Sequence, residues 1–165
     1  MNYKYTYESP LGTMIMLGTL TYLTDLFFVD EAHAPSYDDA GYIEQLTGPF
    51  EVTKMWLDQY FSGKKPFIIP PIKLEGTEFR KYVWAVLQTI PYGVTTTYGD
   101  IGKEIAKQQG KDTMSAQAVG GAVGHNPISI IIPCHRVIGS NGKLTGYAGG
   151  IERKKYMLDL EAKHK

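Results

Sequence analysis

Residues 97–124 read TYGDIGKEIAKQQGKDTMSAQAVGGAVG, and this stretch combines two helical patterns joined by a short loop. Thr97 and Asp100 have the spacing of a capping box, which predicts a first helix through about Lys107. Residues 115–124 predict a second helix composed almost entirely of small residues. Two helices joined by a short loop that contains glycine are typical of a helix-turn-helix that docks on DNA.

The second helix contains Gly120 and Gly121 in its interior. Glycine at a helical position costs about 1 kcal/mol relative to alanine, so this helix is unfavourable unless another surface approaches its backbone closely. That surface is either a neighbouring helix of the protein or a bound duplex. The residues of the helix alone leave both interpretations open.

The flanking segments extend this helical region. Thr77 is a suitable N-cap for a helix whose apolar residues fall on one face and which stops at residues 91–93. On the other side, the β-branched run Ile128–Ile132 predicts a buried strand that ends just before Cys134. A final helix is expected over about residues 151–162.

The first part of the chain has a different pattern. Short β-prone runs separated by turns predict an antiparallel meander before residue 31, and a polar, loop-like segment then leads to a helix over residues 50–61. Residues 64–76 contain three prolines and no sustained periodicity, which is the composition of an extended connection. We therefore expect an α/β (α+β) fold, with an N-terminal domain at residues 1–70 and a mainly helical C-terminal domain at residues 71–165.

The charges are divided unevenly between the two halves, although the net charge is zero. Residues 1–75 carry 5 Lys+Arg against 10 Asp+Glu, and residues 76–165 carry 12 against 7, so the halves have net charges of −5 and +5. A basic C-terminal half favours an anionic partner such as nucleic acid. Uneven charge on a solvated surface gives the same count.

Composition also excludes several classes of protein. The single cysteine excludes an intramolecular disulfide, and the four scattered histidines do not have the spacing of a metal site. No apolar run is long enough to span a membrane, and the N-terminus has no signal-peptide pattern. We expect a cytoplasmic protein that needs no metal.

Cys134 is followed directly by His135 and Arg136. A thiol with the ordinary pKa of about 8.5 is only slightly ionised at neutral pH, so a nucleophilic cysteine needs a proton acceptor or a positive charge nearby. His135 can supply the first and Arg136 the second. A lone cysteine is also often a small buried hydrophobic residue, so this pair alone does not decide between catalysis and packing.

The string IIPCHRV at residues 131–137 resembles the active-site signature of the 6-O-alkylguanine-DNA alkyltransferases, also called methylated-DNA-protein-cysteine methyltransferases. Further landmarks of that family follow in order: IPYG at 90–93, TYGDI at 97–101, AVGGA at 118–122 and GYAGG at 146–150. Residues 1–70 match more loosely, and the resemblance implies a ribonuclease-H-like α/β domain there.

The resemblance implies a DNA repair reaction that consumes the protein. Cys134 would attack the alkyl carbon on the 6-oxygen of guanine and retain the alkyl group as a thioether, in one irreversible turnover and without a cofactor. His135 would take the thiol proton through a water, and Tyr98 would donate a proton or hydrogen bond to the departing guanine. Asn126 would tie the small-residue helix to the Cys134 turn.

The resemblance also implies how guanine and DNA are bound. The carbonyls of Cys134 and Val137 would accept from the exocyclic amine, the Ala148 N–H would face the 6-oxygen, and Tyr147 and Gly149 would wall the pocket. The duplex would be bound from the minor groove, with the target nucleotide flipped out of the stack. The expected DNA contacts are Thr97, Ser115, Ala116, Gln117, Ala118, Gly120, Gly121 and Arg136.

Two positions depart from the family pattern. Gln117 stands where many members have an arginine that replaces the flipped base, and Lys155 stands where many have a glutamate that orients the histidine. We therefore expect a relay that lacks its acidic end, with Glu152 about one turn earlier as a candidate substitute.

Three other functions remain open. A non-catalytic lesion sensor keeps this fold but typically has tryptophan in place of Cys134. A helix-turn-helix regulator that senses alkylation would need a further domain or cysteine, and a Cys-His hydrolase would turn over many substrates. The partner we expect is double-stranded DNA that carries 6-O-alkylguanine, and possible activity on 4-O-alkylthymine stays open. We expect the protein to act as a monomer, away from membranes.

Overall fold

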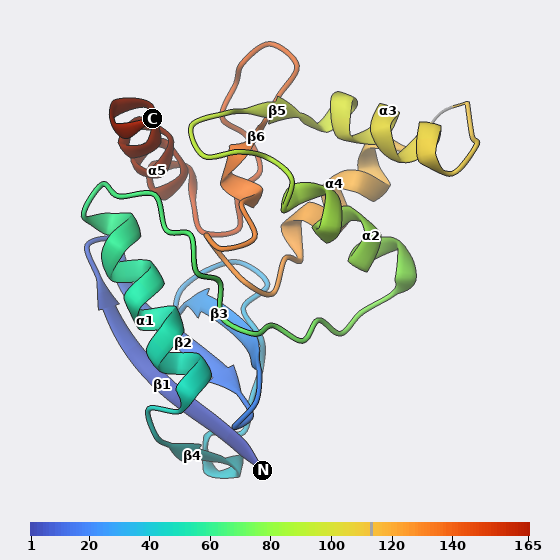
Figure 1. Cartoon of the computed structure of the whole chain (residues 1–165). Helices are drawn as coiled ribbons and strands as arrows, with labels where there is room; N and C mark the ends of the chain where they lie inside the picture. Colours follow the sequence, from blue (N-terminus) through green and yellow to red (C-terminus); the bar gives the residue numbers. More distant parts are fainter. Residues whose placement is uncertain (113) are drawn as a thin grey trace.

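Figure 1 shows the computed structural model of the protein, which describes residues 1–112 and 114–165. The predicted antiparallel meander is confirmed: β1 (Asn2–Ser9), β2 (Gly12–Gly18) and β3 (Leu23–Phe28) pair in sequence order. A short strand, β4 (Tyr42–Glu44), adds in parallel to β1 and gives the strand order β3-β2-β1-β4.

The segment between β3 and the first helix was predicted to be loop-like, and this is wrong where β4 and the 3-10 helix η1 (Asp39–Gly41) form. A strand of three residues is too short to show the alternation by which strands are predicted. Its formation depends on pairing with β1, which is distant in the sequence.

Helix α1 (Gly48–Phe61) confirms the helix predicted in this half and lies over the sheet in Figure 1. The Thr47 side chain accepts the Phe50 N–H and so caps the helix. The inward face of the helix buries Phe50, Trp56, Leu57 and Tyr60. Tyr60 therefore sits near the end of α1, within the core rather than at the surface.

The C-terminal part confirms the predicted helices. They are α2 (Glu78–Leu87), α3 (Tyr98–Gln108), α4 (Ala116–Gly124) and α5 (Ile151–His164). Thr77, Thr97 and Ser115 cap α2, α3 and α4, each accepting the backbone N–H three residues later. A small parallel pair, β5 (Thr96–Thr97) and β6 (Val137–Ile138), joins the start of α3 to the chain just after Cys134.

The predicted strand over Ile128–Ile132 is wrong. Only Ile128 makes a β-bridge, and the following residues form a turn in which the Ile132 N–H donates to the Ile128 carbonyl at 3.0 Å. Ile130 has φ 72°, a left-handed conformation that β-branched residues rarely adopt. The isoleucines are nevertheless buried, so hydrophobicity predicted their burial correctly and their backbone shape wrongly.

Strand β3 joins the two parts of the chain. Leu26 bridges to Ile128, donates to the Pro127 carbonyl at 2.8 Å and accepts from the Ser129 N–H at 2.9 Å. The buried side chains of both parts form a single hydrophobic cluster. The N-terminal sheet therefore directly supports the turn that leads into Cys134. Within the described residues, no helix has both the length and the apolar character that a membrane crossing requires.

Candidate active site and nucleic-acid interface

Cys134 opens a 3-10 turn, η2 (Cys134–Arg136), and is 6% exposed. The Asn126 side chain holds this turn: its Nδ2 donates to the Ile132 carbonyl at 2.7 Å and to Cys134 Sγ at 3.2 Å. Its Oδ1 accepts the Ile128 N–H at 2.9 Å. One amide side chain thus joins the end of α4 to both sides of the turn and fixes the position of the sulfur.

Burial raises the pKa of the Cys134 thiol to about 11, although the Asn126 hydrogen bond and the Lys154 charge oppose this shift and Glu31 adds to it. The sequence suggested that Arg136 would promote thiolate formation, but the cation that favours the thiolate is Lys154. The thiol is therefore protonated at rest, and its reaction requires a base that removes the proton during the reaction.

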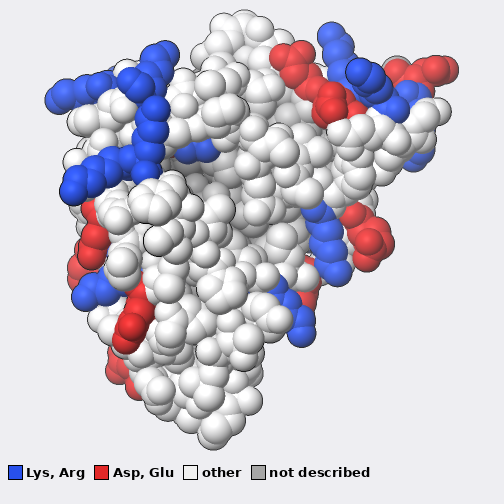
Figure 2. Space-filling view, in the orientation of Figure 1, with Lys and Arg blue, Asp and Glu red and all other residues white. Residues whose placement is uncertain are grey.

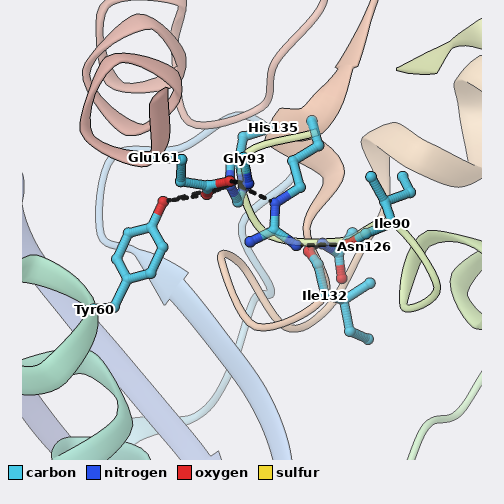
Figure 3. A network of polar contacts seen from close by, with 8 residues as sticks. Tyr60, Ile90, Gly93, Asn126, Ile132, His135 and Glu161 are labelled. Atoms are coloured by element: carbon cyan, nitrogen blue, oxygen red, sulfur yellow. Dashed lines mark hydrogen bonds and ion pairs between the residues drawn. The ribbon is translucent and has the colours of Figure 1, made fainter. Parts of the chain in front are cut away.

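That base lies in a buried polar network, which Figure 3 shows. His135 Nε2 lies 2.5 Å from Glu161 Oε2, and the Tyr60 hydroxyl donates to the same oxygen at 2.6 Å. The other carboxylate oxygen accepts from Arg136 Nε at 2.7 Å and from the Gly93 N–H at 3.0 Å. Gly93 has φ 79°, a conformation that favours glycine. It belongs to the turn that was predicted to end the preceding helix, and this turn therefore also supplies a donor to Glu161.

The network determines the protonation states of its members. Burial alone would raise the pKa of Glu161, but hydrogen bonds and charges from His135 and Arg136 outweigh it and lower that pKa to about 2. Burial lowers the pKa of His135, with partial opposition from Glu161. Because an ionised carboxylate accepts the proton on Nε2, the Nδ1 lone pair of neutral His135 is the site that can take a proton.

The expectation of a relay without an acidic end is therefore wrong. Glu161 occupies that end, whereas Lys155 and Glu152 are exposed on α5. The buried face of α5 carries Lys154, Met157 and Glu161, at the three- and four-residue spacing of one side of a helix. This spacing is the sequence signal that could have identified Glu161. An acid on the buried face of a helix needs hydrogen-bond donors inside the protein.

The prediction that Arg136 contacts DNA is also corrected. Arg136 is 8% exposed, its Nη1 donates to the Ile90 carbonyl at 2.7 Å, and its guanidinium lies over the Tyr92 ring. Because its Nε pairs with Glu161, the positive charge of Arg136 is neutralised inside the protein. Adjacency to Cys134 in the sequence did not reveal this orientation.

Of the residues predicted to form the guanine pocket, Tyr98 and Tyr147 lie close enough to Cys134 for its charge to raise the pKa of their hydroxyls. The Tyr98 hydroxyl is 3.4 Å from the Thr145 carbonyl, and burial raises the pKa of Tyr98, with Cys134 adding to the shift. Tyr147 packs against the hydrophobic core and has a buried hydroxyl. The Ala148 carbonyl accepts the Ala32 N–H at 2.9 Å, and Gly149 is buried.

Two carbonyls that were assigned to the exocyclic amine already have protein donors. Val137 O accepts from Lys154 Nζ at 2.5 Å, and Cys134 O accepts the Val137 N–H. Each carbonyl has a second lone pair, so both retain the capacity to bind a ligand amine. The buried Lys154 was missed in the sequence, since lysine is usually exposed on a helix.

Helix α4 presents most of its small residues outward, although Ala122 is buried. Gln117 and Gly121 are exposed, and a Cβ added at Gly120 or Gly121 would meet no atom within 4 Å. Close internal packing therefore does not explain these glycines. The remaining predicted contact residues here, Ser115, Ala116 and Ala118, are exposed as well, while Thr97 is half-buried at the start of α3.

A hollow of about 280 Å³ lies beside this surface and is lined by Tyr98, Ala116 and residues of α3. It places the predicted pocket tyrosine next to the first turn of α4. The helix itself carries no charge. On the face shown in Figure 2, Lys and Arg gather over α5 and the segment after α1, and others lie over α3 together with Asp and Glu. Among the described residues, no group of three or more His, Cys, Asp or Glu is placed to hold a metal ion.

Comparison with known proteins identifies the family. The profile described as "6-O-methylguanine DNA methyltransferase, DNA binding domain" matches residues 78–163, and that of the "ribonuclease-like domain" matches residues 2–75. The chain belongs to the 6-O-methylguanine DNA methyltransferase family. The family resemblance of the Cys134 motif thus extends over both parts of the chain.

Individual members of this family are similar over nearly their full length. The methylated-DNA–protein-cysteine methyltransferase of Mycolicibacterium paratuberculosis is 43% identical over 159 residues, covering 96% of this chain and 92% of the relative. That of Methanosarcina acetivorans is 40% identical and covers 96% and 97%. The crystal structure of Mycobacterium tuberculosis OGT in complex with DNA superposes with a TM-score of 0.83 at 40% identity, covering 98% of this chain and 94% of that one.

Proposed function

We propose that this protein repairs DNA by transferring a methyl or other alkyl group from the 6-oxygen of guanine to Cys134, once per molecule. The observation that carries the proposal is the buried thiol held by Asn126 and followed directly by a histidine bound to an ionised glutamate. A chain of this family with one cysteine has one possible acceptor.

The chemistry begins with removal of the thiol proton. His135 Nδ1 is buried without a hydrogen-bond partner in the described chain, and a bridging water passes the Cys134 proton to it. The sulfur then attacks the alkyl carbon, so that a C–S bond forms while the C–O bond to guanine breaks. The electron pair of that bond remains on the guanine, and the imidazolium is stabilised by Glu161.

The departing guanine is neutralised by a proton or hydrogen bond from Tyr98, whose raised pKa keeps its hydroxyl protonated. The Val137 and Cys134 carbonyls accept from the exocyclic amine, and the Ala148 N–H faces the 6-oxygen. Tyr147 and Gly149 form the pocket wall. The thioether product cannot be displaced by water, so the protein is consumed.

DNA is bound through the exposed face of α4, with Thr97 and Ser115 at the adjacent helix starts. The absence of side chains at Gly120 and Gly121 allows the duplex backbone to approach closely. Because the alkyl carbon is inaccessible inside a duplex, the nucleotide is flipped outward, which costs a few kcal/mol. Gln117 lies in the first turn of α4, where it meets the space that the base leaves.

Three further assignments belong to this proposal. The boundary between the two domains lies near residue 70, in the proline-rich connection. The protein acts in the cytoplasm. It acts as a monomer, since one chain contains the thiol, its base and the DNA-facing helix.

Intact-protein mass spectrometry tests the proposal. The protein is mixed with a duplex that contains one 6-O-methylguanine, and the modified residue is mapped by peptide fragmentation. We expect a single added methyl group on Cys134 at one equivalent. Tight binding without a mass change would instead support a lesion sensor, and continued turnover would support a hydrolase.

A further inference from the structure

The relay receives a side chain from the N-terminal part of the chain. Tyr60 lies on α1 and is 101 positions away from Glu161, yet its hydroxyl donates to Glu161 Oε2 at 2.6 Å. The same hydroxyl is 3.4 Å from His135 Nε2. Tyr60, His135 and Glu161 are each at most 1% exposed, so no solvent competes for these contacts.

The two carboxylate oxygens of Glu161 have different surroundings. Oε1 accepts from Arg136 Nε and from the Gly93 N–H. Oε2 accepts from the Tyr60 hydroxyl, and it is also the oxygen that contacts His135. Tyr60 and His135 therefore share one oxygen, and the electron density available to the histidine depends on the tyrosine.

Packing holds the tyrosine ring in one orientation. The ring stacks on Trp56 with centroids 5.3 Å apart and meets the edges of Phe61, Tyr92 and His135. A ring fixed on several sides directs its hydroxyl at Oε2 without a large entropic cost at the time of reaction. This arrangement exceeds what interdomain packing alone requires, since phenylalanine would fill the same space.

We propose that Tyr60 is a positioning residue of the relay: by donating to Glu161 Oε2 it weakens the interaction of that oxygen with His135 and so limits how strongly basic His135 is. This inference rests on the proposed alkyl transfer for its biological meaning. A hydrogen bond donated to a carboxylate lowers its attraction for a second proton donor. Removal of the hydroxyl therefore makes His135 more basic, and a stronger donor makes it less basic.

Several other titratable groups surround Tyr60 and His135. Arg136 lies in the same turn as His135, Tyr92 in the turn after α2, Lys154 on α5 and Tyr147 in the pocket loop. Arg136 and Lys154 both disfavour the imidazolium form of His135. All of these groups remain in place when the Tyr60 hydroxyl alone is changed, so a change in pH dependence can be assigned to that hydroxyl.

The test compares Tyr60→Phe with a matched control, Tyr7→Phe. Like Tyr60, Tyr7 is a buried tyrosine whose hydroxyl donates to a carboxylate at 2.6 Å. The partner of Tyr7 is Asp58 on α1, which lies outside the relay. Single-turnover methyl transfer from the duplex is measured between about pH 5 and about pH 9. In parallel, iodoacetamide alkylation of Cys134 is followed over the same range, which requires no DNA.

In Tyr60→Phe we expect the acid limb of both profiles to move to higher pH by roughly half a unit to one unit. In Tyr7→Phe it stays where it is in the unmodified protein. Replacement of Tyr60 by 3-fluorotyrosine, whose hydroxyl is a stronger donor in a ring of nearly the same size, moves the limb to lower pH.

Profiles of Tyr60→Phe that superpose on those of the unmodified protein overturn the inference, as does an equal shift in Tyr7→Phe. If Tyr60→Phe does not fold, the fluorinated protein decides, because an unshifted limb there contradicts the proposal. Absence of methyl transfer in the unmodified protein, together with a shifted iodoacetamide profile, contradicts the proposed function and supports the role of Tyr60.

Discussion

The Glu161 network and helix α4 differ in where their residues find partners. In the network, both carboxylate oxygens have donors inside the protein, and the side chains of Tyr60, His135, Arg136 and Glu161 are almost fully buried. In α4, most of the exposed residues are small, and a methyl group added at Gly120 or Gly121 would touch no other residue. The residues of the network are explained by the protein alone, whereas those of the outward face of α4 are explained only by a ligand.

This difference separates two kinds of mutational effect. A change in the network should alter both stability and chemistry, because it leaves buried groups unpaired. A change on the outer face of α4 should alter DNA binding while leaving the fold unchanged or more stable. The following predictions test that separation, in order of expected size.

The largest effect is expected for Cys134→Ala. Loss of the only thiol abolishes methyl transfer, but the small-residue face of α4 is unchanged, so binding to alkylated duplex persists. Mass spectrometry and a gel-shift titration measure the two properties separately. Loss of binding together with transfer would show that recognition and chemistry are not separate in this protein.

Glu161→Gln should affect both properties. Arg136 loses its ionic partner in a buried site, which costs about 3–5 kcal/mol of the free energy of unfolding. The His135 imidazolium loses its counter-charge, so we expect methyl transfer to fall by about 10²–10⁴-fold. Urea denaturation and single-turnover kinetics measure these effects, and Glu152→Gln on the exposed face of α5 is the control. Unchanged kinetics in Glu161→Gln would remove Glu161 from the relay.

The lowered pKa of Glu161 predicts that the stability of the protein depends on pH. The pKa of Glu161 is about 2 in the folded protein against an ordinary value of 4.5, so folding is favoured when the group is ionised. This contribution, about 3 kcal/mol, is fully present above about pH 4.5 and is lost as the pH falls toward 2. Denaturation at several pH values should show that Glu161→Gln loses less stability than the unmodified protein over this interval.

Gly121→Ala should separate folding from DNA binding. Alanine is the better helix former, and its methyl group meets no protein atom, so the free protein should gain roughly 0.5–1 kcal/mol. The same methyl group keeps the duplex at a distance and should weaken binding about tenfold, equivalent to about 1.4 kcal/mol.

Gly102→Ala is the control for this glycine effect. Gly102 is buried in α3, where a Cβ would make ordinary contacts with Met114 and Val119 at 3.7–3.9 Å. It should stabilise the protein similarly but leave DNA affinity unchanged. Equal DNA affinities of the two alanine variants would contradict a close approach of DNA to α4.

The smallest effect is expected for Gln117→Arg, which should speed repair a few-fold. A guanidinium stacks on neighbouring bases and adds a positive charge in the space left by the flipped nucleotide. Gln117 is exposed, so the substitution should leave the thermal unfolding temperature unchanged. An equal or lower single-turnover rate would reject the base-replacement argument.

Local patterns predicted much of this molecule. Capping residues or apolar periodicity located α1, α2 and α3, because helix formation depends on neighbours within about one turn, and the helices α4 and α5 were also predicted. The β-branched run before Cys134 was correctly expected to be buried, but the prediction of a strand failed. Its backbone is set by the Asn126 side chain and the left-handed Ile130, and neither has a signature in hydrophobicity.

The sequence by itself determined the helices, the sheet meander, the sole possible nucleophile and, through the Cys134 motif, the family. Only the tertiary structure decided which acid serves His135, that Arg136 points inward, and that Tyr60 completes the network. The physical reason is distance along the chain. Glu161 meets partners 25 to 101 positions away, and a buried carboxylate is defined by the donors that folding brings to it.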